Sequence, residues 1–238
     1  MGSQALVDYR NQMRGWAQGC CVPVFYRDDT FRLHNGSMTF VDTGTEILGI
    51  TAGHVADDII KYCDGSPGHG CQVGCADLAP DRLVARHPKL DLATFRLSAP
   101  FVTAGNGHSV TVPSWPPRAP RVGEQVLFCG YPGIYREEKD GQYATAFLYF
   151  GGLVESVSDR NFGMVLRIAS AYDRGHERVP ANADLGGWSG GAVFRVVENE
   201  TLARLEFAGI IYEYSPVWGI VLAHPVSCVA PDGAFVMD

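Results

Sequence analysis

Short apolar runs alternate with turn-forming residues along most of the chain. Val22, Val24 and Tyr26 are apolar at every second position, the period of a half-buried β-strand. We predict further strands with this character, and a hairpin turn at 42–45 between the first two of them. The ranges are 36–41, 46–51, 82–86, 90–97, one strand within 122–133, 147–154, 164–168, 192–197, 205–211 and 218–222. Many short strands at this spacing are typical of β-barrels.

Two segments have a helical period instead. Leu6, Tyr9, Met13 and Trp16 recur at helical spacing, which predicts a short amphipathic helix in the first 19 residues with its apolar side on the domain. A shorter helical stretch is expected at 55–62. The chain therefore reads as mainly β, with helices only as additions.

The densest proline run, residues 112–120, divides the chain into two halves of similar size. We predict one domain over residues 1–238. Its parts are an N-terminal helix at 1–20, a first β-barrel lobe at 21–112, a linker at 113–120 and a second lobe at 121–238.

Composition narrows the classes of function. Of the 238 residues 46% are apolar and 19% charged, as in globular proteins, and a net charge of −7 argues against nucleic acid or an anionic membrane as partner. No apolar run approaches the roughly 18 residues of a membrane span. The first 19 residues lack the basic start and apolar core of a secretory signal.

Seven cysteines are an odd number and do not suggest a secreted disulfide framework. We therefore expect a reduced, cytoplasmic setting, although a secreted form whose signal has been removed would have the same sequence. Cys63, Cys71 and Cys75 surround His69 but match no common zinc module. A flexible loop with free thiols is the preferred interpretation, and we expect no metal and no cofactor.

Chemistry is concentrated in the stretch 183–194, where Ser189 follows Gly187-Trp188 and precedes two glycines. Glycines on both sides of a serine allow a tight turn that brings Oγ and nearby main-chain N–H groups close to a reacting carbonyl. Gly187 and Ser189 are the candidate N–H donors of an oxyanion hole.

Two other stretches contain a histidine and an aspartate that could act together with Ser189. His54 lies in Thr51-Ala52-Gly53-His54, and Asp91 lies in Leu90-Asp91-Leu92-Ala93. A serine hydroxyl becomes nucleophilic when a base accepts its proton and a third group orients the base. About 37 residues separate His54 from Asp91, and about 98 separate Asp91 from Ser189. These three side chains can therefore meet only if the fold brings them together.

The order His, Asp, Ser in these contexts resembles the trypsin-like, chymotrypsin-fold serine peptidases. The likeness is greatest to the bacterial single-domain and HtrA-like branches, here without a PDZ domain. The resemblance implies an all-β fold of two six-stranded-type antiparallel barrels with the site between them. It also implies a serine endopeptidase that cuts protein or peptide substrates through His54, Asp91, Ser189 and an acyl-enzyme.

The same resemblance implies where substrate binds. The strand 209–214 would pair with it, and the wall of the specificity pocket would come from Ala183, Asp184, Tyr212, Glu213, Tyr214 and Gly219. A small uncharged residue at 183 argues against a pocket that simply prefers an Arg or Lys side chain of the substrate. The neighbouring Asp184 keeps that preference open.

This chain departs from the digestive enzymes at residue 188. Those enzymes have an aspartate before the nucleophile that pairs with a newly cut N-terminus, and here the residue is Trp188. Activation by that ion pair is excluded, and an activating partner that orders residues 171–183 is an open alternative.

Two further interpretations are weighed. A chymotrypsin-fold binding or regulatory protein without turnover is the main alternative. An α/β-hydrolase also fits Gly-x-Ser-x-Gly, but that fold needs an acid and a histidine after the serine, and the 49 residues after Ser189 have β character.

Overall fold

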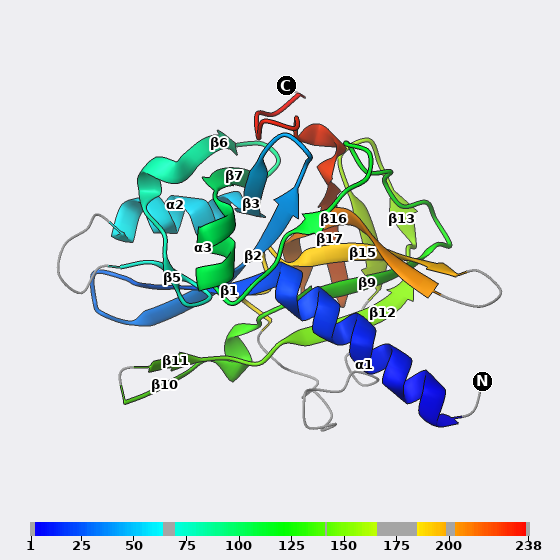
Figure 1. Cartoon of the computed structure of the whole chain (residues 1–238), viewed down its shortest axis with the longest axis horizontal. Coiled ribbons are helices and arrows are strands. Elements are labelled where there is room, and N and C mark those ends of the chain that lie inside the picture. Colours follow the sequence, from blue (N-terminus) through cyan, green and yellow to red (C-terminus); the bar gives the residue numbers. More distant parts are fainter. Residues whose placement is uncertain (1–2, 64–69, 141, 166–184, 199–202, 237–238) are drawn as a thin grey trace.

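The computed structural model describes residues 3–63, 70–140, 142–165, 185–198 and 203–236. Two curled, mainly antiparallel sheets lie side by side, and the N-terminal helix crosses below the second (Figure 1). The expected all-β, chymotrypsin-like fold is confirmed, and within the described residues the first sheet has eight strands and the second has seven.

The first sheet has the order β5-β4-β1-β2-β3-β7-β6, with β8 parallel to β2. Its strands are β1 (Cys21–Arg27), β2 (Leu33–Asp42), β3 (Ile47–Ala52), β4 (Gln72–Val73), β5 (Ala76–Asp77), β6 (Leu83–His87), β7 (Leu92–Leu97) and β8 (Val110–Thr111). Two helices accompany it, α2 (Gly53–Tyr62) after β3 and α3 (Ala99–Ala104) after β7.

The second sheet has the order β12-β9-β15-β16-β17-β14-β13. Its strands are β9 (Gln125–Gly130), β12 (Leu148–Leu153), β13 (Ser156–Val157), β14 (Phe162–Val165), β15 (Ala192–Glu198), β16 (Ala203–Ser215) and β17 (Ile220–Pro225). A separate hairpin, β10 (Glu137–Lys139) with β11 (Gln142–Ala144), folds back toward β1, where Arg27 pairs with Glu138 at 2.5 Å.

Most expected strands are confirmed; two of them begin clearly later than expected, and two short strands lie where a loop was expected. β7 begins at Leu92 and not at Leu90, because Asp91 has a φ of 48° and leaves the extended conformation. β17 begins at Ile220 because residues 216–219 form a turn with Gly219 at a φ of 61°. Two short strands, β4 and β5, lie in the segment expected to be a loop, and residues 64–69 of that segment lie outside the described residues.

The predicted N-terminal helix is present as α1 (Ser3–Cys20). Its last turns pack on the domain, where Ala17 and Cys20 are buried and the Trp16 ring meets the edge of Phe194 with 5.2 Å between centroids. Among the described residues, no helix combines the length and apolar character required to cross a membrane.

Each sheet encloses an apolar core, and a third core joins the two sheets. Phe40 and Phe95 belong to the core of the first sheet, and Phe128 and Trp188 to that of the second. The joining core contains Leu48 and Ile50 of β3 together with side chains of β15 and β16, among them Phe194, Phe207 and Ile210. This packing fixes β3, which leads into His54, against β16 and the turn that carries Ser189.

Candidate active site

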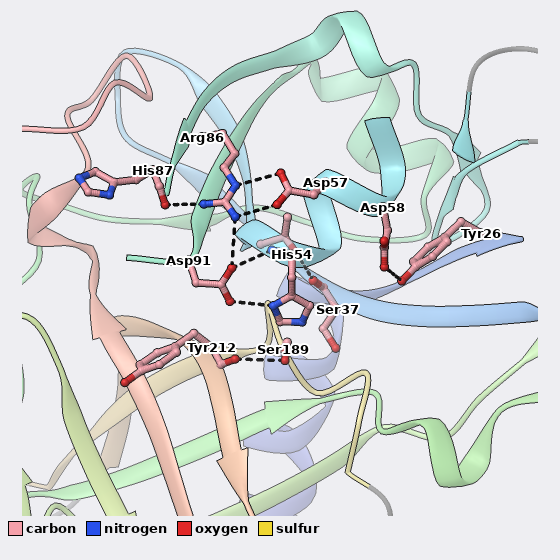
Figure 2. Close-up of polar contacts among 11 residues, drawn as sticks. Tyr26, Ser37, His54, Asp57, Asp58, Arg86, His87, Asp91, Ser189 and Tyr212 are labelled. Carbon is pink, nitrogen blue, oxygen red and sulfur yellow. Dashed lines mark hydrogen bonds and ion pairs between the residues drawn. The ribbon is translucent and has the colours of Figure 1, made fainter. Parts of the chain in front are cut away.

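His54 and Asp91 meet where α2 and β7 begin. α2 starts at Gly53 directly after β3, so that His54 occupies its first turn. The His54 Nδ1 lies 2.7 Å from Asp91 Oδ2, and the main-chain N–H of His54 donates to Oδ1 at 2.8 Å (Figure 2). The Gly53 N–H donates to the main-chain oxygen of Asp91 at 2.7 Å. Both carboxylate oxygens of Asp91 are thus directed at one residue, which fixes the imidazole orientation.

The electrostatics follow from this contact. The hydrogen bond to Asp91 raises the pKa of His54 above its usual value, against partial burial, which lowers it. Burial alone would raise the pKa of Asp91, but the hydrogen bonds and charge of His54, with Arg86, lower it on balance. The His54 side chain is 53% exposed, so that a substrate has access to it.

Ser189 lies on a tight turn between residues 185 and 191. The N–H of Trp188 donates to Leu185 O at 3.1 Å, and the N–H of Gly191 donates to Trp188 O at 3.0 Å. Gly187 has a φ of 90° and Gly190 a φ of 89°, a region that favours glycine. The flanking glycines recognised in the sequence therefore serve the backbone of this turn.

The first sheet anchors that turn. Ser37 on β2 donates its N–H to Ser189 O at 2.9 Å and its hydroxyl to Gly187 O at 2.9 Å. A Cβ on Gly190 would meet the Ser37 carbonyl oxygen and the Thr51 hydroxyl. Thr51 stands three residues before His54, so the serine turn packs directly on the strand that leads to the histidine. Figure 2 shows Ser189 next to the His54 ring.

The Ser189 hydroxyl is directed at the second sheet in this structure. Its Oγ donates to the main-chain oxygen of Tyr212 at 3.3 Å. Tyr212 is the extra residue of a bulge in β16, where the register with β17 shifts between Ile211 and Glu213. Bulges often occur beside active sites, where they redirect a backbone group or side chain.

The two candidate oxyanion donors share this turn. Among the hydrogen bonds formed between described residues, none uses the N–H of Gly187 or of Ser189 as donor. Neighbouring amides are committed, since Gly190 N–H donates to Ile211 O at 2.7 Å. Within the described residues, these two main-chain donors on either side of Trp188 therefore have no acceptor, as the predicted oxyanion hole requires.

The predicted substrate-binding residues lie in different places. Tyr212, Glu213 and Tyr214 follow one another at the end of β16, and Gly219 lies in the turn to β17. Ala183 and Asp184 lie outside the described residues, as does the segment 171–183.

One edge of β16 is available there. β15 pairs with β16 only as far as Ala192 opposite Ile210, whereas β17 continues to Ser215. Within the described chain, the other edge of residues 212–215 has no strand beside it. An extended peptide can add there as another strand.

Trp188 occupies the core of the second lobe. It is 1% exposed, and its ring meets Phe150 edge to face with 5.1 Å between centroids. The residue before the serine is therefore a packing anchor for the turn.

Sequence reasoning missed two polar residues around this site. Arg86 lies behind Asp91, with Nη2 at 3.6 Å from Oδ1. Asn35, 7% exposed, donates from Nδ2 to Tyr131 O at 2.7 Å and accepts from Arg136 at 2.8 Å beside the serine turn. No local pattern marks either residue, because Asp91 lies 5 residues from Arg86 and the partners of Asn35 lie 96 and 101 residues away.

The described residues contain no cluster of three metal-ligating side chains. Cys63 and Cys71 are buried and Cys75 is exposed, and all three are free thiols. His69 lies outside the described residues.

Several solved structures are similar to this chain. A serine endoprotease from Yersinia pestis superposes with a TM-score of 0.53 at 19% identity, over 91% of this chain and 62% of that chain. A thermostable serine protease from an extremophilic microorganism gives 0.46 at 16% identity, over 87% and 90%. The tobacco vein mottling virus protease gives 0.47 at 8% identity, over 87% and 76%.

The chain spans less than two thirds of the Yersinia protein, and likeness at this level of identity concerns the fold. A comparison with curated protein sequences gave no match. The model of the trypsin-like peptidase domain matches residues 36–203, which include His54, Asp91 and Ser189. The chain therefore belongs to the trypsin-like peptidase domain family.

Proposed function

We propose that this protein hydrolyses peptide bonds through His54, Asp91 and Ser189 by way of an acyl-enzyme. The observation that carries the proposal is the bidentate contact of Asp91 with His54, at 2.7 Å to Nδ1 and 2.8 Å to the main-chain N–H. This contact fixes the Nδ1–H tautomer and leaves Nε2 as the base.

In the first step Ser189 Oγ attacks the substrate carbonyl carbon while His54 Nε2 accepts the hydroxyl proton. For this the hydroxyl leaves the Tyr212 oxygen and turns to His54. Catalytic hydrogen bonds commonly tighten only when substrate is bound. Negative charge develops on the carbonyl oxygen, where the N–H groups of Gly187 and Ser189 receive it.

The intermediate collapses when the carbon–nitrogen bond breaks and His54 returns its proton to the leaving amine. A water molecule then attacks the carbonyl carbon of the acyl-enzyme while His54 accepts a proton from it. The bond between that carbon and Ser189 Oγ breaks and His54 returns the proton to Oγ, which releases the carboxylic acid and restores Ser189. Asp91 stays ionised throughout and stabilises the imidazolium that forms twice in the cycle.

Substrate is proposed to bind as an extended strand on the free edge of residues 212–215. Main-chain hydrogen bonds along such an edge are independent of side-chain identity, so that they provide affinity for proteins and peptides in general. Glu213 is exposed and Tyr214 half-buried at this edge, where they would contact substrate side chains.

A fluorophosphonate probe tests the nucleophile. The wild-type protein should be labelled at residue 189, and Ser189→Ala should not be labelled. Ser158→Ala is the control, because it removes a hydroxyl from an exposed turn of the second sheet and leaves the nucleophile and the substrate edge in place. Labelling that persists in Ser189→Ala would reject the assignment, and a folded wild type with neither labelling nor cleavage would favour a binding protein.

We also propose a reducing, cytoplasmic setting. Six of the seven cysteines are buried free thiols, and Cys75 is exposed. Cell fractionation followed by thiol labelling tests this, and recovery in the secreted fraction with oxidised cysteines would contradict it.

A further inference from the structure

The guanidinium of Arg86 lies between two carboxylates, that of Asp57 on α2 and that of Asp91. Nε and Nη2 bind the Asp57 oxygens at 3.0 and 2.7 Å, and Nη1 donates to His87 O at 2.6 Å. Nη2 also lies 3.6 Å from Asp91 Oδ1, the oxygen that accepts the His54 N–H. Figure 2 shows these contacts as one connected set behind His54.

The start of α2 is shaped to admit this guanidinium. A Cβ on Gly53 would lie 2.5 Å from Arg86 Cζ, closer than van der Waals contact permits. Glycine between Ala52 and His54 therefore lets the planar cation pack flat against the helix start. A bidentate arginine pair of this kind has a defined direction, unlike a lysine ion pair.

The charges around Asp91 come from several elements. α2 contributes Asp57 and Asp58, and the Asp58 carboxylate accepts from the Tyr26 hydroxyl at 2.5 Å. β6 contributes Arg86 and His87. Tyr212 of β16 and His224 of β17 face Asp91 from the second sheet, and His224 Nδ1 lies 2.6 Å from Arg160 O. Within the described part of the chain, Arg86 is the one permanently charged cation paired with Asp91.

We propose that Arg86 is a positioning residue of this site, which holds Asp91 ionised and correctly oriented and thereby sets the pH at which His54 becomes neutral. The proposal rests on the function proposed for His54 and Asp91. Asp57 fixes the guanidinium, and Arg86 moderates the negative field that Asp91 exerts on the imidazole.

The expected direction follows from the charges. The hydrogen bond to Asp91 raises the pKa of His54 most, and the positive charge of Arg86 acts in the opposite sense. Removal of Arg86 leaves the Asp57 carboxylate without its partner and Asp91 without its cation. The imidazolium is then more stable, so that His54 becomes neutral only at higher pH.

The test is an NMR titration of the His54 ring in the full chain. Arg86→Gln and Arg86→Met remove the charge, and the methionine keeps an unbranched apolar stem beside Gly53. Both should raise the pKa of His54 by about 0.5 unit or more, because a cation near a carboxylate shifts such groups by this order. The acid limb of kcat/KM should move to higher pH with it, and kcat should fall about tenfold as Asp91 loses a fixed partner.

Two further variants separate charge from structure. Arg86→Lys keeps the positive charge but loses the planar guanidinium that binds a carboxylate through two N–H groups. The pKa of His54 should therefore stay within about 0.2 unit of wild type, while kcat falls several-fold. Arg96→Gln removes an arginine from β7 whose ion pair is with Glu46 at 3.4 Å, and it should change neither quantity.

An unchanged His54 pKa in folded Arg86→Gln or Arg86→Met would overturn the proposal and leave Arg86 as a tie between β6 and α2. A shift of the same size in Arg96→Gln would also overturn it, because the effect would then be one of net charge. The titration needs no turnover, so it remains decisive even where peptide cleavage is absent and the proposed function fails.

Discussion

The main-chain N–H of Ser37 in β2 donates to the main-chain oxygen of Ser189, on the turn before β15, at 2.9 Å. The Ser37 hydroxyl accepts from Tyr131 N–H and donates to Gly187 O, both at 2.9 Å. One buried residue of the first lobe therefore holds the turn on which the candidate nucleophile and both oxyanion donors lie.

Ser37→Ala should slow probe labelling and peptide cleavage about tenfold. The Gly187 carbonyl loses its hydroxyl donor, so that the turn which carries Ser189 is held less firmly in place. The free energy of unfolding should fall by about 1–3 kcal/mol, the cost of buried polar groups left unpaired. Stopped-time labelling and urea unfolding measure the two effects. Ser158→Ala, on an exposed turn of the second sheet, is the control and should leave the labelling rate unchanged.

The pH dependence of kcat/KM should show an acid limb above the usual histidine value of about 6.5. The hydrogen bond to Asp91 raises the pKa of His54, and only neutral imidazole accepts the serine proton. Activity is thus full above the raised pKa and is lost as pH falls through it. A rate that is constant between pH 5 and 8 would contradict this role.

Asp91→Asn should move the acid limb to lower pH, because both the hydrogen bond and the negative charge that raise the pKa of His54 are weakened. The value of kcat should fall by about 10³ to 10⁴, the loss seen when a triad loses its orienting acid. Steady-state kinetics across pH measures both. An equal loss in Asp81→Asn, on the outer face of the first lobe, would indicate a general charge effect.

Gly190→Ala tests the packing of the serine turn on the first sheet. The added Cβ would meet Ser37 O and the Thr51 hydroxyl at a φ of 89°, so we expect destabilisation by more than about 2 kcal/mol and loss of probe labelling. Gly44→Ala is the matched control, since φ is 82° but the site is open. It should cost about 1 kcal/mol and leave labelling intact.

Trp188→Ala should lower the free energy of unfolding by about 3–5 kcal/mol, because it empties a fully buried site beside Phe150. Trp218→Ala, which truncates a side chain that is 74% exposed, should change stability by less than about 0.5 kcal/mol. Thermal and chemical unfolding of both variants checks this. Similar losses in the two would contradict the anchoring role of Trp188.

The sequence by itself determined which local structures form and which residue types are present for chemistry. The alternation of apolar residues predicted β1, β2 and β3, and helical spacing predicted α1, because these periods reflect one buried face of a single element. The glycines beside Ser189 indicated a tight turn for the same local reason. Residue order and context selected His54, Asp91 and Ser189 as the candidates among the histidines, acids and serines of the chain.

Tertiary structure alone decided what depends on distant partners. The left-handed backbone at Asp91 starts β7 later than its apolar pattern suggests, because Gly53 and His54 hold that residue from another element. Arg86 has no signal in the sequence, since Asp57 is 29 residues away and meets it only because α2 packs on β6, while Asp91 lies 5 residues on, in the turn between β6 and β7. The spacing of apolar residues along one helix or strand shows which of its faces is buried. The contacts of a charged side chain depend instead on how separate elements pack together.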